Sequence, residues 1–163
     1  MPKYYDMGTT GSATTDGTTQ TEAVHLAMLT TASGNVVRIT QVLAQARHTT
    51  AGGAAIRIKH TGGLFSGGGA ITPTPRQAST GAQAAAVSCF STGSALTAGT
   101  APVIRQQFGF AQTGGTGGWT AVEPDDAIQL LPKTTSTFGN AEFHSIAIGT
   151  AVPFGLSVEF SES

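Results

Sequence analysis

Apolar and polar residues alternate in many short stretches of this chain, and this period of two constrains the fold more than any other feature. Residues 22–29 and 153–160 place apolar side chains at every second position. In 54–60, two isoleucines alternate with Arg57 and Lys59. Successive side chains of a strand point to opposite faces, so these segments predict half-buried β-strands, and the two charges are expected to face outward.

The same reasoning predicts eight or nine short strands and no helix. Residues 82–90 are interpreted as a loop or short turn that runs into a strand, and Trp119 opens a short strand after a loop at 113–118. The apolar face of 35–46 shifts near Val42 and Leu43, which indicates a β-bulge. Further strands are expected at 22–29, 35–46, 54–60, 101–110, 127–131, 141–149 and 153–160. We therefore expect an all-β, single-domain β-sandwich that is jelly-roll-like.

Glycine and proline mark the connections between these strands. Residues 48–53 suit a hairpin connection, and Pro124 followed by two aspartates predicts a tight turn. Residues 62–76 contain five glycines, which permit positive φ, and then Pro73 and Pro75, which hold an extended path. We expect this segment to be a long loop on the sandwich.

The N-terminal segment has a different composition from the rest. Residues 8–21 contain no large apolar side chain, so burial does not offset the entropy lost on ordering them. We expect residues 1–21 to form an N-terminal arm, extended or disordered, and residues 22–163 to form the sandwich domain.

Charged residues are scarce, at 10% of 163 residues, compared with about 25% in ordinary soluble domains. The formal net charge is −1 and no lysine or arginine cluster exists, which argues against nucleic-acid binding. No apolar run of about 18 residues is present, so no membrane span is expected. The first ten residues lack a signal-peptide apolar region, and a single cysteine excludes an intrachain disulfide. We expect synthesis in the cytoplasm.

Residues that could carry chemistry do not form a recognisable site. The histidines are His25, His48, His60 and His144. None has the sequence spacing of a zinc ligand set, although Glu142 and His144 share one strand face. The carboxylates at 123, 125 and 126 are explained by the turn itself. No metal site and no cofactor is expected.

Three remaining features also favour structural interpretations. Cys89 lies within an alternating segment and is expected to be a buried strand residue rather than a nucleophile. The glycine clusters match no phosphate-binding motif. Trp119 follows a glycine-rich stretch and either closes one end of the sandwich or forms a sugar-stacking platform, the first being favoured. We expect the protein not to be an enzyme.

The order of the segments resembles a family of small virion proteins, the capsid decoration or cement proteins of tailed bacteriophages. The resemblance rests on "VVRITQVLAQA", "AAIRIKH" and "SGGGAITPTPRQAS", followed by "GTAPVIRQQFGF", "EPDDAIQLLP" and "GLSVEFSE". It covers residues 35–162. The chain differs from the family in lacking acidic residues before 54–60 and in its longer segment 134–153.

The resemblance implies a structural role on the virion, at the outer surface of the capsid. It implies the major capsid protein as a partner and a homo-oligomer, with a trimer expected. The N-terminal arm and the 62–76 segment would then contact neighbouring proteins, together with Trp119. The expected interaction residues are Tyr4, Tyr5, Gly67, Gly68, Gly69, Ile71, Pro73, Pro75, Arg76 and Trp119.

Two alternatives remain open at this stage. The first is a tail, fibre or baseplate module that binds a host receptor or glycan, which an exposed Trp119 would favour. The second is a metal-dependent enzyme with a cupin-like fold, which requires that His25, His60 or His144 converge with Glu142.

Overall fold

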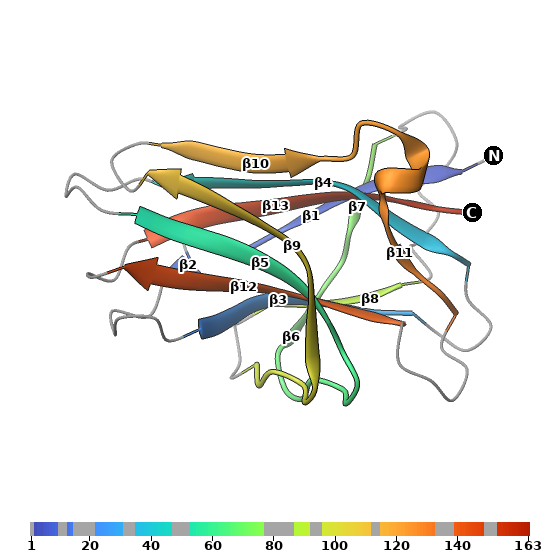
Figure 1. The fold of residues 1–163 in the computed structure, drawn as a ribbon. Helices are drawn as coiled ribbons and strands as arrows, with labels where there is room; N and C mark the ends of the chain where they lie inside the picture. Colours follow the sequence, from blue (N-terminus) through green and yellow to red (C-terminus); the bar gives the residue numbers. More distant parts are fainter. Residues whose placement is uncertain are drawn as a thin grey trace.

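The protein is an all-β sandwich, which confirms the predicted fold class (Figure 1). The computed structural model describes residues 2–9, 13–14, 22–30, 35–46, 53–76, 87–91, 96–111, 115–132, 139–148 and 153–163. These residues form two antiparallel sheets whose inner faces share one hydrophobic core. The two termini lie side by side, because the first strand pairs antiparallel with the last.

The first sheet has the strand order β10-β4-β13-β1-β7, with β11 also paired to β4 and β2 also paired to β13. Its strands are β10 (Thr116–Thr120), β4 (Val37–Ala46), β13 (Pro153–Glu162), β1 (Lys3–Gly8), β7 (Thr74–Pro75), β11 (Ile128–Leu130) and β2 (Ala13–Thr14). The second sheet has the order β6-β8-β3-β12-β5-β9. Its strands are β6 (Gly69–Ile71), β8 (Ser88–Ser91), β3 (Glu22–Leu29), β12 (Asn140–Ile148), β5 (Gly53–Thr61) and β9 (Pro102–Ala111).

Strand β13 shows how the alternation in the sequence builds the core. Its apolar residues Phe154, Leu156, Val158 and Phe160 are all buried, as the period of two predicts. The ring of Tyr5 stacks on Phe160 with the two centroids 5.4 Å apart. The C-terminal strand therefore supplies a central row of the core.

Strand β4 contains the predicted bulge. It lies at Thr40, two residues before Val42, where the sequence indicated the shift of the apolar face. The register against β13 shifts so that Thr40 is the extra residue. Before the bulge Val37 and Ile39 are buried, and after it the buried positions become Val42 and Ala44. The bulge thus keeps apolar side chains on the inner face along the whole strand.

The expectation that residues 1–21 form an N-terminal arm is wrong for the residues of β1. This strand pairs along its whole length with β13 and buries Tyr5 and Met7 in the core. The low hydrophobicity of residues 8–21 does not extend back to these positions, where buried side chains alternate with more exposed ones. Most of 8–21 lies outside the described residues, apart from Gly8, Thr9 and the short strand β2.

Two predicted connections are also wrong. Residues 48–53 do not close a hairpin, because β4 and β5 belong to different sheets and the chain crosses from one layer to the other between them. Residues 48–52 themselves lie outside the described residues. Residues 116–118, expected in a loop, belong to β10, where Trp119 pairs with Val42 of β4. Strand pairing across the sheet extends this strand into a glycine-rich stretch that has no apolar alternation of its own.

The segment 62–76 is a crossover between the two sheets rather than a single long loop. Its strand β6 pairs with β8 of the second sheet, and its strand β7 pairs with β1 of the first. Gly67 and Gly68 have φ values of 73° and 85°, so the predicted positive φ is confirmed there. The segment therefore covers one edge of the sandwich.

The turn predicted at Pro124 is confirmed as a single 3₁₀ turn, η1 (Pro124–Asp126). The side chain of Asp126 accepts a hydrogen bond from the backbone N–H of Glu123 at 3.2 Å. Strand β11 follows directly and pairs with β4. The turn and strand place η1 beside the edge of the sandwich opposite to segment 62–76 (Figure 1).

Candidate functional site

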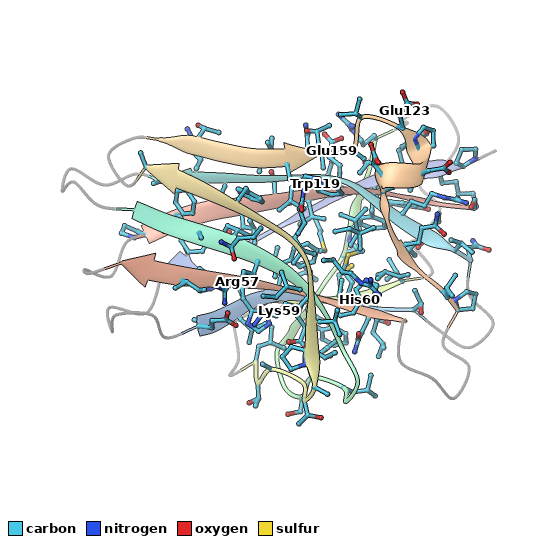
Figure 2. All side chains as sticks on the ribbon, in the orientation of Figure 1. Arg57, Lys59, His60, Trp119, Glu123 and Glu159 are labelled. Atoms are coloured by element: carbon cyan, nitrogen blue, oxygen red, sulfur yellow. The ribbon has the colours of Figure 1, made fainter. Side chains whose placement is uncertain are left out.

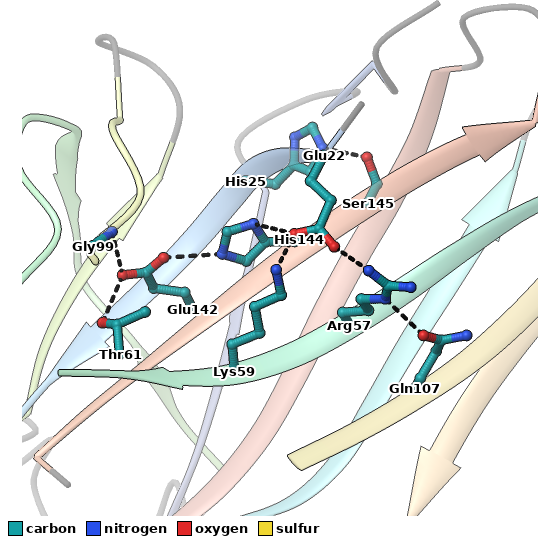
Figure 3. A network of polar contacts seen from close by, with 10 residues as sticks. All are labelled: Glu22, His25, Arg57, Lys59, Thr61, Gly99, Gln107, Glu142, His144 and Ser145. Carbon is teal, nitrogen blue, oxygen red and sulfur yellow. Dashed lines mark hydrogen bonds and ion pairs between the residues drawn. The ribbon is translucent and has the colours of Figure 1, made fainter. Parts of the chain in front are cut away.

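A cluster of charged side chains lies on the outer face of the second sheet (Figure 3). Ala141 and Phe143 of β12 belong to the core, so Glu142 and His144 project from the opposite face. Strand β5 adds Lys59 to the same cluster. Although Glu142, His144 and Lys59 project away from the core, all three of them are buried.

Glu22 of β3 joins two cations of β5. Its carboxylate accepts hydrogen bonds from Arg57 and from Lys59, and one of its oxygens lies 3.6 Å from Nδ1 of His144. Arg57 also donates from Nε to the side-chain oxygen of Gln107 at 2.6 Å, which extends the network to β9. Four strands of the second sheet are therefore connected by side chains as well as by backbone hydrogen bonds.

Glu142 is fully buried and has a hydrogen-bond partner at each carboxylate oxygen. Oε1 accepts from the Gly99 N–H at 2.9 Å and from the Thr61 hydroxyl at 3.0 Å, and Oε2 lies 2.9 Å from Nε2 of His144. Burial acts to raise the pKa of Glu142, but the hydrogen bonds from His144, Gly99 and Thr61 outweigh it and lower the pKa. The carboxylate is therefore held in its charged form.

Gly99 is held against this carboxylate by a close approach of two backbone segments. A Cβ at this position would lie 2.1 Å from the carbonyl oxygen of Gly63 and 2.9 Å from Oε1 of Glu142. Only glycine fits without a shift of the backbone. The segment around Gly99 thus covers the carboxylate of Glu142.

The prediction that Lys59 faces solvent is therefore wrong, since the residue is only 5% exposed. Burial lowers the pKa of Lys59, while the charge of Glu142 opposes that change. Arg57, in contrast, is half-buried. The alternation correctly assigned both residues to the outer face, but it carried no information about the segment that covers one part of that face.

Of the three histidines that the metal-enzyme alternative names, His144 meets Glu142, whereas His25 and His60 have other surroundings. His144 contacts Glu142, but His25 is bonded through Nε2 to the hydroxyl of Ser145 at 2.7 Å. His60 lines a cleft at the edge of the sandwich. Within the described ranges, no group of three or more histidine, cysteine, aspartate or glutamate side chains is arranged to hold a metal ion.

The predicted interaction residues are distributed over different parts of the molecule. The prediction that Tyr5 is a contact residue is wrong, because Tyr5 is 1% exposed and its ring is stacked in the core. Pro73, which was also predicted as a contact residue, is buried as well. Trp119 is half-buried and packs against the core from β10, at the edge of the first sheet opposite to β7 (Figure 2). These three residues do not form one surface.

The other predicted residues lie along the edge formed by segment 62–76. Tyr4 is 42% exposed, and its carbonyl oxygen accepts a hydrogen bond from the Arg76 N–H at 3.0 Å. The Arg76 side chain pairs with Glu159 at 2.7 Å and with Asp6 at 3.4 Å. Strand β7 with Pro75, and β6 with Gly69 and Ile71, complete this edge, which Gly67 and Gly68 precede.

A groove of about 590 Å³ runs along this edge, between β1 and segment 69–76. Hydroxyl-bearing and apolar side chains make up most of its lining. The lining residues are Asp6, Met7, Gly8, Thr9, Ala70, Ile71, Thr72, Thr74 and Ser157. The groove offers many neutral hydrogen-bonding groups and a single charged side chain among those residues.

The cleft that His60 lines, which the sequence did not indicate, lies at the opposite edge between β9 and β11. Its volume is about 390 Å³. It is lined by His60, Arg105, Asp125, Ala127, Ile128, Gln129 and Leu131. Val103 and Ile104, which precede Arg105 on β9, are 49% and 48% exposed. The two adjacent β-branched residues after Pro102 are the sequence signal that could have identified this edge.

Comparisons with known proteins add little to this geometry. No protein-family model matches the chain, and no curated protein matches it. A solved structure described as "Structure of infectious bursal disease virus Gx strain" aligns with 12% identity and a TM-score of 0.17. The alignment covers 99% of this chain and 42% of that chain. At this TM-score the alignment supports neither a shared fold nor a shared function.

The fold and the site define a class of protein rather than a named family. The class is an all-β sandwich with a buried charge network on one sheet and a hollow at each edge. A search of the described helices finds none with the length and apolar character needed to cross a membrane.

Proposed function

We propose that this chain is a structural virion protein that binds the outside of a tailed-phage capsid and stabilises contacts between major capsid protein subunits. The sequence resemblance over residues 35–162 supports this proposal. The groove at the edge formed by segment 62–76 supports it as well, and the groove is the observation on which the proposal depends most.

The groove suits a contact between two protein surfaces of low charge. Threonine and serine hydroxyls donate and accept hydrogen bonds without the desolvation cost of a charged group. Ile71 adds a half-buried aliphatic side chain, and Tyr4 supplies an exposed aromatic ring near the same edge. Weak contacts of this kind give a firm attachment when an oligomer repeats them on a lattice of identical subunits. A homo-oligomer would provide such repetition.

The first experiment is the copy number of the protein in purified virions, measured by quantitative mass spectrometry against the major capsid protein. Hundreds of copies are expected for a protein that covers the shell. A handful of copies would assign it to a tail or a vertex, and would favour a module that binds a host receptor or glycan. Absence from the particle would overturn the proposal.

A matched pair of variants tests the groove itself. Thr72→Arg places a long, positively charged side chain in the groove. Thr116→Arg places the same side chain on β10 at the opposite edge, and both threonines are exposed. We expect Thr72→Arg to reduce binding to undecorated capsids at least about tenfold, while Thr116→Arg binds normally. Equal binding of the two variants would contradict the assignment of the groove to the capsid.

A further inference from the structure

The edge opposite to the groove has an opening between its two layers. Strand β9 ends the second sheet, and β10 and β11 end the first, because both pair with the same side of β4. The C-terminal half of β9 runs beside β10 and contacts it (Figure 1). The N-terminal half of β9 and strand β11 instead border the cleft of about 390 Å³. The cleft is thus flanked by two sheet edges.

The walls of this cleft carry opposite charges. Arg105 lies on the β9 wall, and Asp125 lies on the wall formed by η1 and β11. Ile128 and Leu131 also line the cleft, and Leu131 is 47% exposed. His60 also lines the cleft, and burial together with the nearby charge of Arg105 lowers its pKa to about 4, so the imidazole is neutral at pH 7.

The edge of β9 is suited to a short contact rather than a long ladder. Pro102 has no backbone N–H, and Arg105 is an extra residue in the register against β5, which forms a bulge. Between these two positions lie Val103 and Ile104, both about half exposed. Natural proteins protect edge strands by such devices, yet exposed β-branched side chains remain here. A partner that covers this edge would bury them.

The cleft has a cation on one wall and an anion on the other, and apolar side chains also line it. A surface of this kind is complementary to a second copy of itself. In a two-fold contact, residue i of one copy meets residue j of the other, and residue j meets residue i. We propose that two copies of this chain associate through the β9–β11 cleft, with their β9 edges antiparallel and Arg105 of each copy facing Asp125 of the other. The contact uses the edge opposite to the groove, so it leaves the proposed capsid contact free, although it replaces the expected trimer by a dimer.

The test uses the isolated protein in sedimentation equilibrium, without capsids. The wild type is expected to form dimers. Arg105→Asp and Asp125→Arg each create like-charge contacts at both ends of the two-fold interface, so each is expected to weaken dimerisation at least about tenfold. Glu123→Arg alters an exposed carboxylate near the same turn that does not line the cleft, and it is expected to dimerise as the wild type does.

A mixture of the two cleft variants gives the decisive result. In a mixed dimer, the aspartate introduced by Arg105→Asp faces the arginine introduced by Asp125→Arg. At the other end of the interface, the unchanged Asp125 of the first copy faces the unchanged Arg105 of the second, so both contacts are complementary again. We expect the mixture to form heterodimers although each variant alone dimerises weakly, an outcome that a contact within one chain would not produce. A monomeric wild type, a trimer, or a mixture that does not associate would each overturn the proposal.

Discussion

Replacing Glu142 by alanine is the sharpest test of the buried charge network. The change removes the acceptor of the Gly99 N–H, the Thr61 hydroxyl and His144 at once. The Thr61 hydroxyl keeps a second hydrogen bond, which it accepts from the side-chain amide of Asn140 at 2.8 Å. The Thr61 O–H thus loses its acceptor but the hydroxyl keeps one bond, whereas the Gly99 N–H and Nε2 of His144 lose the partner that the carboxylate supplies.

The expected cost follows from these two groups. A buried polar group left without its partner costs about 1–3 kcal/mol, so the pair costs roughly 2–6 kcal/mol. Removing a buried carboxylate also relieves its desolvation, which offsets part of that cost. We therefore expect Glu142→Ala to lower the free energy of unfolding by about 3 kcal/mol. For a chain of this length, that corresponds to a fall in Tm of about 6–12 °C.

Urea denaturation at pH 7 measures this change, and hydrogen exchange locates it. Glu159→Ala is the matched control, because Glu159 makes an exposed ion pair with Arg76 whose loss is expected to cost less than about 1 kcal/mol. The Gly99 amide should lose protection in Glu142→Ala. If Glu142→Ala is no less stable than Glu159→Ala, the network does not hold the segment around Gly99 and the reasoning is refuted.

Three further predictions concern acid stability, thiol reactivity and one glycine. Burial lowers the pKa of His25 and of His60 to about 4, so between pH 6.5 and 4 the unfolded chain binds protons that the folded chain does not. Stability should therefore fall as the pH drops through this window, by up to about 3 kcal/mol for each histidine, and a urea midpoint unchanged between pH 7 and 4 would contradict this. Burial raises the pKa of Cys89 to about 12, so a thiol reagent at pH 8 should label it only after unfolding in urea. Gly68→Ala, at φ +85°, should lower stability by about 1 kcal/mol or more, whereas Gly53→Ala meets no atom within 4 Å and should change Tm little.

The site was less predictable than the fold. The sequence identified Glu142 and His144 as neighbours on one strand face, because a spacing of two is local information. It did not identify their connection to Glu22 or Gly99, which come from distant parts of the chain. The cleft at β9 and β11 was missed for the same reason, since its walls belong to different sheets.

The alternation of apolar residues was enough to determine that much of the chain forms strands and, in β13 and β4, which side of the strand faces the core. The buried row of β13 and the bulge in β4 both follow from it. Only the tertiary structure decided which strands pair, that β1 joins the sheet, and that Lys59 is covered. A period of two specifies the two faces of a strand, but its partners are chosen by packing between segments far apart in the sequence.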